Sequence, residues 1–247
     1  MSRVGENASI SGEARIGAGV TIGPNVCIYA DVTIGDGCTI FAGAVLGRPP
    51  KRAGVTTRPL GDPGPLTIGA ASVIGANAVL YAGSTLGAGT LIGDLASIRE
   101  GCRIGDEAFI GRGVLVMYDT TVGARSRVID GTILTGNMTI EADVFIGPGV
   151  VTINDNEVYL KRFGLLPFSA PGPVVRRFAL IGAGANLAAG VEVGLGAVVA
   201  PSAMVTRDVP DWMVAAGVPA RLVRAVAAAD RDRVLAHFGL IPLTEVA

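Results

Sequence analysis

The chain has 247 residues, a formal net charge of -1 and three cysteines, and 50% of its residues are hydrophobic. This charge balance argues against the basic surface that binding to nucleic acid or an anionic membrane requires. The cysteines stand at no metal-binding spacing, so we expect neither a disulfide framework nor a structural zinc site, and we expect a reducing cytoplasm as the compartment.

The first part of the chain carries an aliphatic residue at every sixth position: Ile10, Ile16, Ile22, Ile28, Ile34, Ile40 and Leu46. Residues 47–65 are rich in proline, glycine and basic residues and predict a loop excursion from this repeat. The spacing from Leu46 to Ile68 is not a multiple of six, which also requires a loop. The first ten residues, MSRVGENASI, lack the apolar region of a signal peptide.

The repeat then runs without a slip from Ile68 to Ile146. A smaller residue stands two positions before most of the aliphatic residues. Because the side chains of a strand alternate between its faces, each hexad predicts a short strand with both of these residues inward. About half of the residues that follow the aliphatic are glycine, which suits a corner. The uncharged stretch 63–93 keeps this period, which predicts a buried core and not a membrane helix.

Residues 152–178 predict a second excursion, after which the repeat resumes at Ile181 and ends near Val205. An alanine-rich stretch from Leu222 to Phe238 predicts a helix that caps the open strand edge of the last coil. The expected organisation is a β-helix domain of residues 1–221, with excursions 47–65 and 152–178, followed by a helix and tail of residues 222–247. About 26 hexads predict eight to nine coils.

A second period of eighteen residues lies on top of the first. Five residues that directly follow the aliphatic residue of a hexad, and that are not glycine, recur at this spacing: Tyr81, Arg99, Met117, Thr135 and Ile153. Three hexads therefore make one coil of a triangular prism, and these residues stack on one edge of it. The next two columns of the same edge contain Glu100, Tyr118 and Asn154, then Asp119, Asn137 and Asp155. This file of polar residues beside a long loop predicts an acceptor cleft, and a polar subunit contact is the alternative.

The repeat and the chain ending resemble the hexapeptide-repeat acyltransferases. Residues 207–210 (RDVP) and 216–221 (AGVPAR) resemble the C-terminal signature of that family beside its coenzyme A site. Residues 98–106 (IREGCRIGD) and 140–156 (IEADVFIGPGVVTINDN) resemble nucleotide-linked N-acetyltransferases of 3-amino-3,6-dideoxyhexoses, whereas residues 46–52 (LGRPPKR) are similar to UDP-N-acetylglucosamine O-acyltransferases. The resemblance implies an all-β fold, a left-handed parallel β-helix. It also implies a homotrimer that binds acetyl-CoA and a nucleotide-sugar between subunits.

The histidine content separates these two kinds of acceptor. The O-acyltransferases use a histidine base in the middle coils, and an alcohol needs such a base because it is a poor nucleophile. The only histidine here is His237, in the predicted C-terminal helix. A neutral amine attacks a thioester without that base, so an amine acceptor is predicted. One histidine also cannot supply the three-histidine zinc site of the carbonic anhydrases with this repeat, and no metal is expected.

Candidate catalytic residues are Asp155 as a proton acceptor, together with Glu141 and Asn137. Glu141 replaces the glycine expected after Ile140. Asp155 begins the second excursion, where a polar loop start is the plain alternative. The candidate substrate-binding residues are Arg99, Glu100, Tyr118, Asn154, Asn156, Arg48 and Lys51.

Several of these assignments have open alternatives. Arg99 and Glu100 form an internal ion pair, or Arg99 meets a phosphate. The cations of the first loop, Arg48, Lys51, Arg52 and Arg58, meet a pyrophosphate or form a solvated basic loop. The family resemblance places coenzyme A against backbone amides around Ala183 and Ala200, with its phosphates near Arg207 and Arg221. Two further functions stay open, a UDP-sugar O-acyltransferase that takes its acyl group from acyl-carrier protein and an inactive β-helix scaffold.

Overall fold

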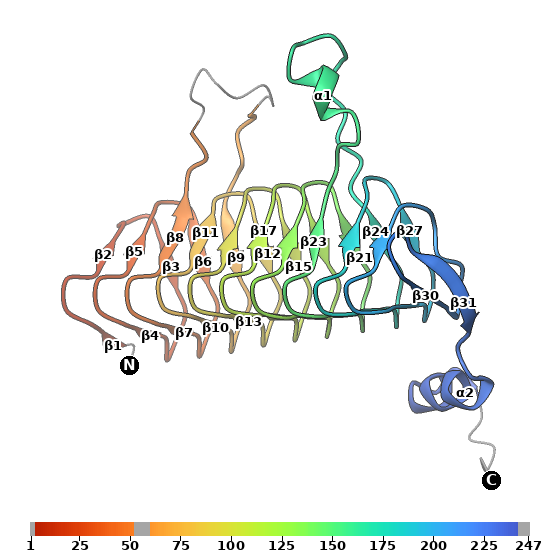
Figure 1. The fold of residues 1–247 in the computed structure, drawn as a ribbon. Helices are drawn as coiled ribbons and strands as arrows, with labels where there is room; N and C mark the ends of the chain where they lie inside the picture. The colour runs from red at the N-terminus through yellow and green to blue at the C-terminus, as the bar shows by residue number, and fades with distance from the viewer. Residues whose placement is uncertain (1–2, 52–59, 242–247) are drawn as a thin grey trace.

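The computed structural model describes residues 3–51 and 60–241, and in them the chain winds into an elongated triangular prism of short strands (Figure 1). Strands eighteen residues apart pair in parallel, so that Val73 lies beside Leu91 and Leu91 beside Phe109. Each coil contributes one strand to each of three sheets. The predicted all-β parallel helix with three hexads per coil is therefore confirmed. The left-handed sense of the coil stays an expectation drawn from the resemblance.

The three sheets are named A, B and C in the order in which the chain passes through them. Sheet A contains, in spatial order, β1 (Arg3–Val4), β4 (Thr21–Ile22), β7 (Thr39–Ile40), β10 (Val73–Ile74), β13 (Leu91–Ile92), β16 (Phe109–Ile110), β19 (Arg127–Val128), β22 (Phe145–Ile146), β25 (Leu180–Ile181), β28 (Val198–Val199), β30 (Met213–Ala216) and β31 (Arg221–Ala225). All of its pairs are parallel except the antiparallel pair of β30 and β31.

Sheet B contains β2 (Ser9–Ile10), β5 (Cys27–Ile28), β8 (Val45–Arg48), β11 (Val79–Tyr81), β14 (Ser97–Ile98), β17 (Leu115–Val116), β20 (Ile133–Leu134), β23 (Val151–Thr152), β26 (Asn186–Leu187) and β29 (Met204–Val205). Sheet C contains β3 (Arg15–Ile16), β6 (Val32–Ile34), β9 (Leu66–Ile68), β12 (Thr85–Leu86), β15 (Arg103–Ile104), β18 (Thr121–Val122), β21 (Thr139–Ile140), β24 (Val174–Val175) and β27 (Glu192–Val193). Two helices, α1 (Val158–Lys161) and α2 (Ala228–His237), lie outside the prism. Neither of these described helices is long and apolar enough to cross a membrane.

The core of the prism consists of the aliphatic residue of each hexad and the smaller residue two positions before it. Ile74, Leu80 and Ile98 are 0% exposed. Some of the small inward residues carry buried hydroxyl groups. These hydroxyls form hydrogen bonds with backbone carbonyl oxygens at a corner of the following coil. Thus Ser84 Oγ donates to the carbonyl oxygen of Arg99 at 2.7 Å, and Thr120 Oγ1 donates to that of Thr135 at 2.8 Å. Stacked coils thereby hold polar groups in the core without leaving them unpaired.

The second excursion is shorter than predicted, and the coils are more numerous than the predicted eight to nine. Thr152, 3% exposed, is an inward residue of β23, and Val175, 0% exposed, belongs to β24, so the excursion covers residues 153–173. A hydroxyl at an inward position broke the aliphatic pattern. Thr152 Oγ1 donates to the carbonyl oxygen of Ile133 and accepts from the amide of Thr135, so the coil continues through it. Strands at Val4, Thr152, Val175 and Ala215 were missed, and the described part of sheet B alone stacks ten strands.

The predicted C-terminal helix was wrong in its first residues and in its role. Leu222 lies in β31, which pairs antiparallel with β30, and the helix begins at Ala228. The strand β31 therefore covers the edge that the helix was expected to cap. No residue of α2 is buried. Hydrophobic content alone did not distinguish a short exposed strand from the first turn of a helix.

The inward assignment predicts opposite outcomes for two neighbouring residues of β15. Ile104→Asp places an unpaired charge in the core and should lower the melting temperature by roughly 10 °C or more, or prevent folding. Arg103→Asp changes the exposed residue beside it and should leave the melting temperature nearly unchanged. Thermal unfolding followed by circular dichroism compares them, and an equal effect of the two substitutions would show that Ile104 does not face the core.

Candidate functional site

The corners that join sheet B to sheet C form one edge of the prism, the B–C edge, which contains residues 81–83, 99–101, 117–119 and 135–137. Both excursions leave from this edge, the first after β8 and the second after β23 (Figure 1). Five strand spacings separate β8 from β23 in sheet B, which is about 24 Å. The predicted polar columns therefore lie between two protruding segments, as a site open to solvent requires.

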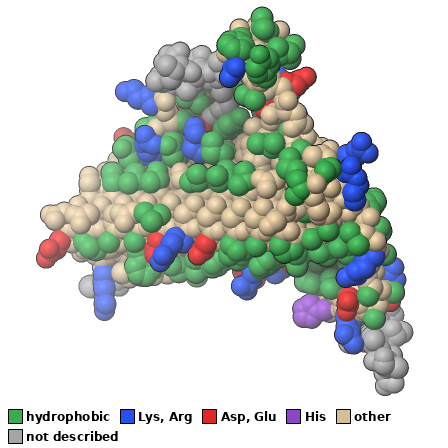
Figure 2. Space-filling model, in the orientation of Figure 1, with side chains coloured by type: hydrophobic (Ala, Val, Ile, Leu, Met, Phe, Trp, Pro, Cys, Tyr) green, Lys and Arg blue, Asp and Glu red, His purple; other side chains and the backbone are tan. Residues whose placement is uncertain are grey.

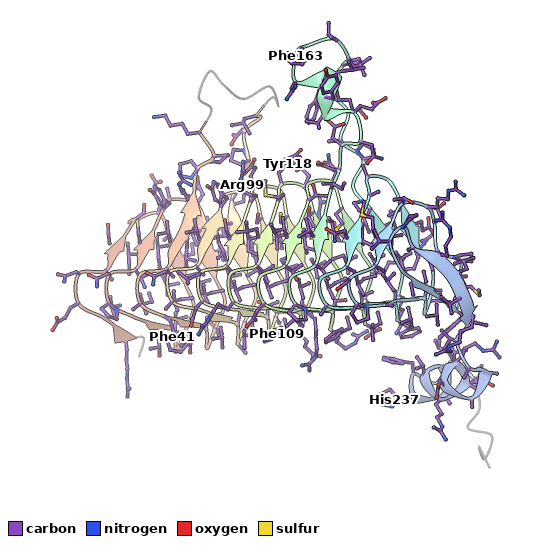
Figure 3. The ribbon with its side chains drawn as sticks, viewed as in Figure 1. Phe41, Arg99, Phe109, Tyr118, Phe163 and His237 are labelled. Carbon is purple, nitrogen blue, oxygen red and sulfur yellow. The ribbon has the colours of Figure 1, made fainter. Side chains whose placement is uncertain are left out.

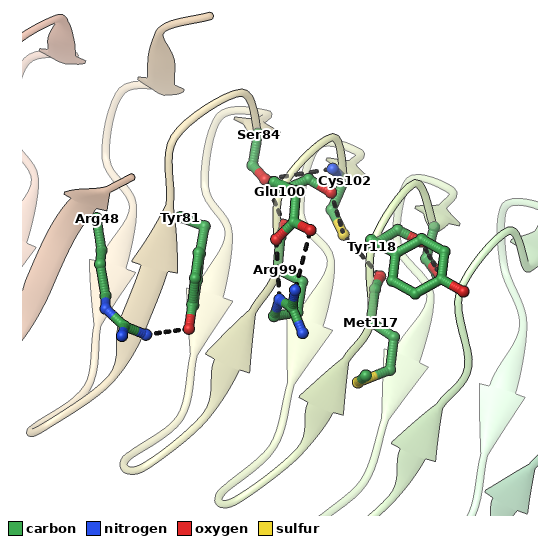
Figure 4. A network of polar contacts seen from close by, with 9 residues as sticks. Arg48, Tyr81, Ser84, Arg99, Glu100, Cys102, Met117 and Tyr118 are labelled. Carbon is green, nitrogen blue, oxygen red and sulfur yellow. Dashed lines mark hydrogen bonds and ion pairs between the residues drawn. The ribbon is translucent and has the colours of Figure 1, made fainter. Parts of the chain in front are cut away.

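The beginning of the B–C edge carries a stack of cations and one aromatic ring (Figure 4). The guanidinium carbons of Arg48 and Arg99 lie 4.9 Å and 5.2 Å from the centre of the Tyr81 ring. Arg48 also donates a hydrogen bond to the Tyr81 hydroxyl. Arg99 donates two hydrogen bonds to Glu100, at 2.8 and 3.0 Å. The predicted Arg99–Glu100 pair is thus present, and its carboxylate is buried while its guanidinium reaches the surface.

Tyr118 lies further along the same edge and rests on a glycine. A Cβ atom at Gly136 would lie 2.5 Å from the Tyr118 ring, so only glycine leaves the ring room to lie there. Asn154 Nδ2 donates to the Tyr118 hydroxyl at 3.3 Å and to the carbonyl oxygen of Gly136 at 3.1 Å. The structure therefore brings together two predicted residues, Tyr118 and Asn154, that are 36 positions apart in the chain.

The third column of the edge has the left-handed backbone conformation that favours glycine, aspartate and asparagine. Its members Gly101, Asp119 and Asn137 have φ of 73°, 54° and 62°. Gly101 leaves the space that the Asp119 carboxylate occupies. Asn137 Nδ2 donates to the carbonyl oxygen of Ala170 at 2.8 Å, which fastens the returning arm of the second excursion to the edge.

A pocket of about 330 Å³ lies between the first excursion and the middle of the B–C edge. Pro50 and residues 60–63 line one side, and Glu100, Gly101 and Asp119 line the other. The amides of Ala82 and Gly83 hold both arms of this excursion by donating to the carbonyl oxygens of Arg48 and Pro65, each at 3.1 Å. Three carboxylates, those of Asp62, Glu100 and Asp119, belong to this pocket. Carboxylate oxygens suit an amine ligand, because they accept its hydrogen bonds.

Asp155 lies beyond this pocket and is engaged in folding the second excursion. Its Oδ1 accepts from the amide of Glu157 at 2.7 Å and from Lys161 Nζ at 3.1 Å. Lys161 also donates to the carbonyl oxygen of Ser169 at 2.7 Å. Burial disfavours the charge on Lys161, but its hydrogen bonds to Asp155 and Glu157 outweigh that and raise its pKa. Asn156 is similarly engaged, since its side-chain amide pairs with both the carbonyl and the amide of Ala189 at 3.3 Å.

Glu141 lies on a different edge, the C–A edge, where sheet C joins sheet A. It accepts hydrogen bonds from Arg176 Nη1 and from the amide of Arg177, both at 2.9 Å. Burial opposes its ionisation, but these contacts hold its pKa below the ordinary value. The structure does not bring Glu141 together with Asp155 and Asn137. Arg176 faces it 35 residues along the chain, beyond the second excursion, and explains why a charged residue replaces the expected glycine.

The residues assigned to coenzyme A lie toward the C-terminal end of the prism, at two places. Arg207 and Arg221 line one cavity of about 200 Å³ with Asp208, Val209 and Ala215. Ala183 and Ala200 lie at the corners that follow β25 and β28, where sheet A joins sheet B. The amide of Ala200 donates to the carbonyl oxygen of Ala215 at 2.8 Å, so this predicted donor is already used inside the coil.

The remaining predicted groups lie away from the pocket or outside the described residues. His237 ends α2, and Figure 3 shows it far from Arg99 and Tyr118. Burial raises the pKa of the Cys102 thiol to about 12, which suits a core residue and not a nucleophile. Lys51 is exposed at the start of the first excursion, whereas Arg52 and Arg58 lie outside the described residues. Residues 3–51 and 60–241 contain no group of histidine, cysteine and carboxylate side chains that could hold a metal ion.

Sequence reasoning missed two parts of this arrangement. Asp62 was treated as part of a loop, because nothing periodic shows that residues 60–63 return to face Glu100 and Asp119. Arg176 and Arg177 were also missed, although Arg176 stands next to an inward residue as Glu141 does. The position of Asp119 on the polar edge was found, but its place in a pocket depends on the fold of the first excursion.

Three comparisons with known proteins bear on this site. A family model described as bacterial transferase hexapeptide (six repeats) matches residues 13–48. The 2,3,4,5-tetrahydropyridine-2,6-dicarboxylate N-acetyltransferase of Staphylococcus aureus (strain JH9) is 47% identical over 58 residues, 24% of this chain and 24% of that protein. The match thus spans about a quarter of the relative. The solved UDP-N-acetylglucosamine acyltransferase from Campylobacter jejuni has a TM-score of 0.56 at 14% identity, over 94% of this chain and 81% of that one, and shows the same fold. The repeat and the fold support the hexapeptide-repeat transferase family.

The ion pairs of the C–A edge predict a pH-dependent contribution to stability. Burial opposes ionisation of Asp143, but hydrogen bonds from Arg125 and Arg177 hold its pKa below 3.8. A lowered pKa stabilises the fold above the unfolded value, and this contribution disappears as the pH falls through the folded value. Asp143→Asn should therefore lower the melting temperature at pH 7, and the difference from the wild type should shrink as the pH falls below 3.8 and through the lower pKa of the folded state.

The control for this measurement is Asp232→Asn, which removes a more exposed partner of Arg231. It should change the melting temperature little at either pH. A difference for Asp143→Asn that persisted unchanged at low pH would show that its ion pairs do not carry the effect.

Proposed function

We propose that the chain transfers an acetyl group from acetyl-CoA to the amine of a nucleotide-linked amino sugar, at the B–C edge. The observation that carries the proposal is the pocket of about 330 Å³ lined by Asp62, Glu100 and Asp119. Carboxylates accept the hydrogen bonds of an amine, and in this pocket Glu100 accepts from Arg99 as well. The relative that matches over 58 residues is an N-acetyltransferase, which also fits an amine acceptor.

The reaction needs little from the protein once the amine is neutral. The amine nitrogen attacks the thioester carbonyl, the carbon–nitrogen bond forms and the carbon–sulfur bond breaks. Coenzyme A leaves as a thiolate, whose pKa near 8.5 makes it a good leaving group. The excess proton on nitrogen passes to a carboxylate, to water or to the departing sulfur. The distant position of His237 does not hinder such a reaction, whereas an alcohol acceptor would lack its base.

We assign the proton acceptor of the pocket to Asp119 in preference to Asp155. Asp119 lies at the pocket wall, whereas Asp155 lies beyond the pocket, where it accepts hydrogen bonds from Lys161 and from the amide of Glu157. Asn137 keeps a positioning role, because its side chain fixes the second excursion beside the pocket. Glu141 has a role in the stability of the C–A edge in this assignment.

We assign the nucleotide to the N-terminal part of the B–C edge and the phosphates of coenzyme A to its C-terminal end. Arg48 and Lys51 are exposed beside the pocket and would meet a pyrophosphate, with Tyr81 and Tyr118 as flat surfaces along the way. Arg207 follows β29 on the B–C edge and shares a cavity with Arg221, which suits the phosphates of coenzyme A. Ala183 and Ala200 lie on the separate edge where sheet A joins sheet B, and there Ala200 would contribute contact and not its amide hydrogen. A homotrimer in the cytoplasm completes the proposal.

Acceptor specificity tests the proposal directly. Acetyl-CoA is incubated with dTDP- and UDP-linked amino sugars, and with the same sugars carrying a hydroxyl in place of the amine, while thiol release is followed. Release with an amino sugar and not with its hydroxyl counterpart is expected. Equal release with hydroxyl sugars would favour O-acylation, and no release with any acceptor would leave the scaffold function.

A pair of aspartate variants tests the assignment of the proton acceptor. Asp119→Asn should lower kcat/KM by roughly 10-fold or more, less than the upper range for a positioned base, because solvent shares proton removal. Asp155→Asn should lower kcat/KM less, and should mainly speed proteolysis of the second excursion by removing the partner of Lys161. The opposite order of the two kcat/KM values would return the role to Asp155.

A further inference from the structure

The second excursion ends in a cluster of large apolar side chains that are between 41% and 69% exposed. We call this cluster the aromatic tip: Val158, Tyr159, Leu160, Phe163, Leu165 and Phe168. Figure 3 places Phe163 at the end of the excursion that is far from the prism, and Figure 2 shows hydrophobic side chains gathered there. Aromatic side chains bury ~150–250 Å² each, so three aromatic and three aliphatic side chains about 60% exposed present on the order of 600 Å². Apolar patches of several hundred Å² mark surfaces that bind a protein or a membrane.

The tip is held in a fixed shape by contacts inside the excursion. Lys161, whose side chain is 9% exposed, donates to Asp155 Oδ1 at 3.1 Å and to the carbonyl oxygen of Ser169 at 2.7 Å, and so joins the two arms. The Tyr159 and Phe163 rings meet edge to face with their centres 6.2 Å apart. A group of fixed shape loses little conformational entropy on binding, which favours association.

The charges of the excursion are balanced and lie beside the apolar end. Residues 153–173 contain two carboxylates and two cations, with no net charge: Asp155, Glu157, Lys161 and Arg162. One charge of each sign reaches the surface, because the Glu157 side chain is 62% exposed and Arg162 is exposed. The guanidinium of Arg162 lies over the Tyr159 and Phe163 rings, 5.1 and 4.5 Å from their centres. Figure 2 shows charged side chains next to the hydrophobic end of the excursion.

We propose that the aromatic tip inserts into the surface of a membrane of zwitterionic phospholipids. The apolar side chains enter the boundary between headgroups and acyl chains, and the Tyr159 hydroxyl stays at the level of the headgroups. Arg162 meets headgroup phosphates and Glu157 meets headgroup ammonium groups. A headgroup with both signs of charge matches this pair. It also requires no basic surface, which a chain of net charge -1 does not supply.

The shape of the tip favours a lipid surface over a protein partner. The tip is convex and lies at the end of a protrusion (Figure 1). A protein partner would need an apolar pocket of matching shape, because the cores of protein interfaces are packed as closely as protein interiors. Lipids rearrange around a convex group of any shape. A second copy packed along the prism would contact the faces of the prism, and the tip lies beyond these faces.

Flotation of the full chain with phosphatidylcholine vesicles tests the insertion. The wild type should float with the vesicles, and Phe163→Ser and Leu165→Ser should each lower its partition coefficient by about tenfold or more, because each removes a side chain that lipid would bury. The matched control is Phe41→Ser, which changes an aromatic residue 50% exposed just after β7 and should leave flotation unchanged. Circular dichroism verifies that each variant is folded. A wild type that does not float, or an equal loss in Phe41→Ser, would overturn the proposal.

The lipid and salt dependence tests the role of the balanced charges. Adding phosphatidylserine to the vesicles or raising the salt concentration should leave the bound fraction nearly unchanged, because the excursion has no net charge. Binding that requires phosphatidylserine and disappears in salt would contradict insertion of the tip, since it would come from a basic surface elsewhere on the chain.

Sedimentation velocity without vesicles distinguishes lipid from a second copy as the occupant. Phe163→Ser should have the oligomeric state of the wild type, because the tip is not used between copies. A smaller assembly in Phe163→Ser would assign the tip to a contact between copies and overturn the proposal. Flotation and sedimentation are measured without acetyl-CoA or a sugar, so neither result depends on acetyl transfer.

Discussion

The close stacking of successive coils is the constraint on which the rest of this structure depends. Where sheet C joins sheet A, a Cβ atom at Gly105 would lie 2.5 Å from the backbone nitrogen of Ala124 in the next coil. Where sheet A joins sheet B, one at Gly147 would lie 2.7 Å from the nitrogen of Ala183. Side chains are therefore excluded from most first corner positions. The B–C edge is the exception, since Tyr81, Arg99 and Met117 stand at that position there, and this edge carries the pocket beside Asp119.

Both excursions also leave the prism from the B–C edge. This is connected with the side chains that the edge carries at its first corner positions. A strand that continues outward at a corner can leave the prism without disturbing the coil beneath it, as β8 does in running on to Arg48. The returning arms are then fastened to groups of the edge, Gly83 for the first and Asn137 for the second. The two excursions border a stretch of the B–C edge about 24 Å long. Carboxylates, guanidinium groups and two tyrosines lie along this stretch, on backbone that the coils hold in place.

The sequence predicted the prism well because its core repeats, and it predicted contacts within the excursions poorly because they do not. Stacking at eighteen residues placed Arg99, Tyr118 and Asp119 on one edge, and the structure agrees. Thr152 was misread because its hydroxyl is satisfied inside the core, which an aliphatic pattern does not register. Asp155 and Lys161 meet only because the second excursion turns back on itself. Asp62 approaches Asp119 only because the first excursion returns along its outgoing arm.

The central claim is that the B–C edge between the two excursions binds the amine that is acetylated. A crystal structure with coenzyme A and a nucleotide-linked amino sugar tests this claim most directly. The account predicts the sugar amine within hydrogen-bonding distance of the Asp119 or Glu100 carboxylate, and the coenzyme A phosphates near Arg207 and Arg221. An amino sugar bound at either of the other two edges of the prism, with the pocket beside Asp119 filled by water alone, would contradict it.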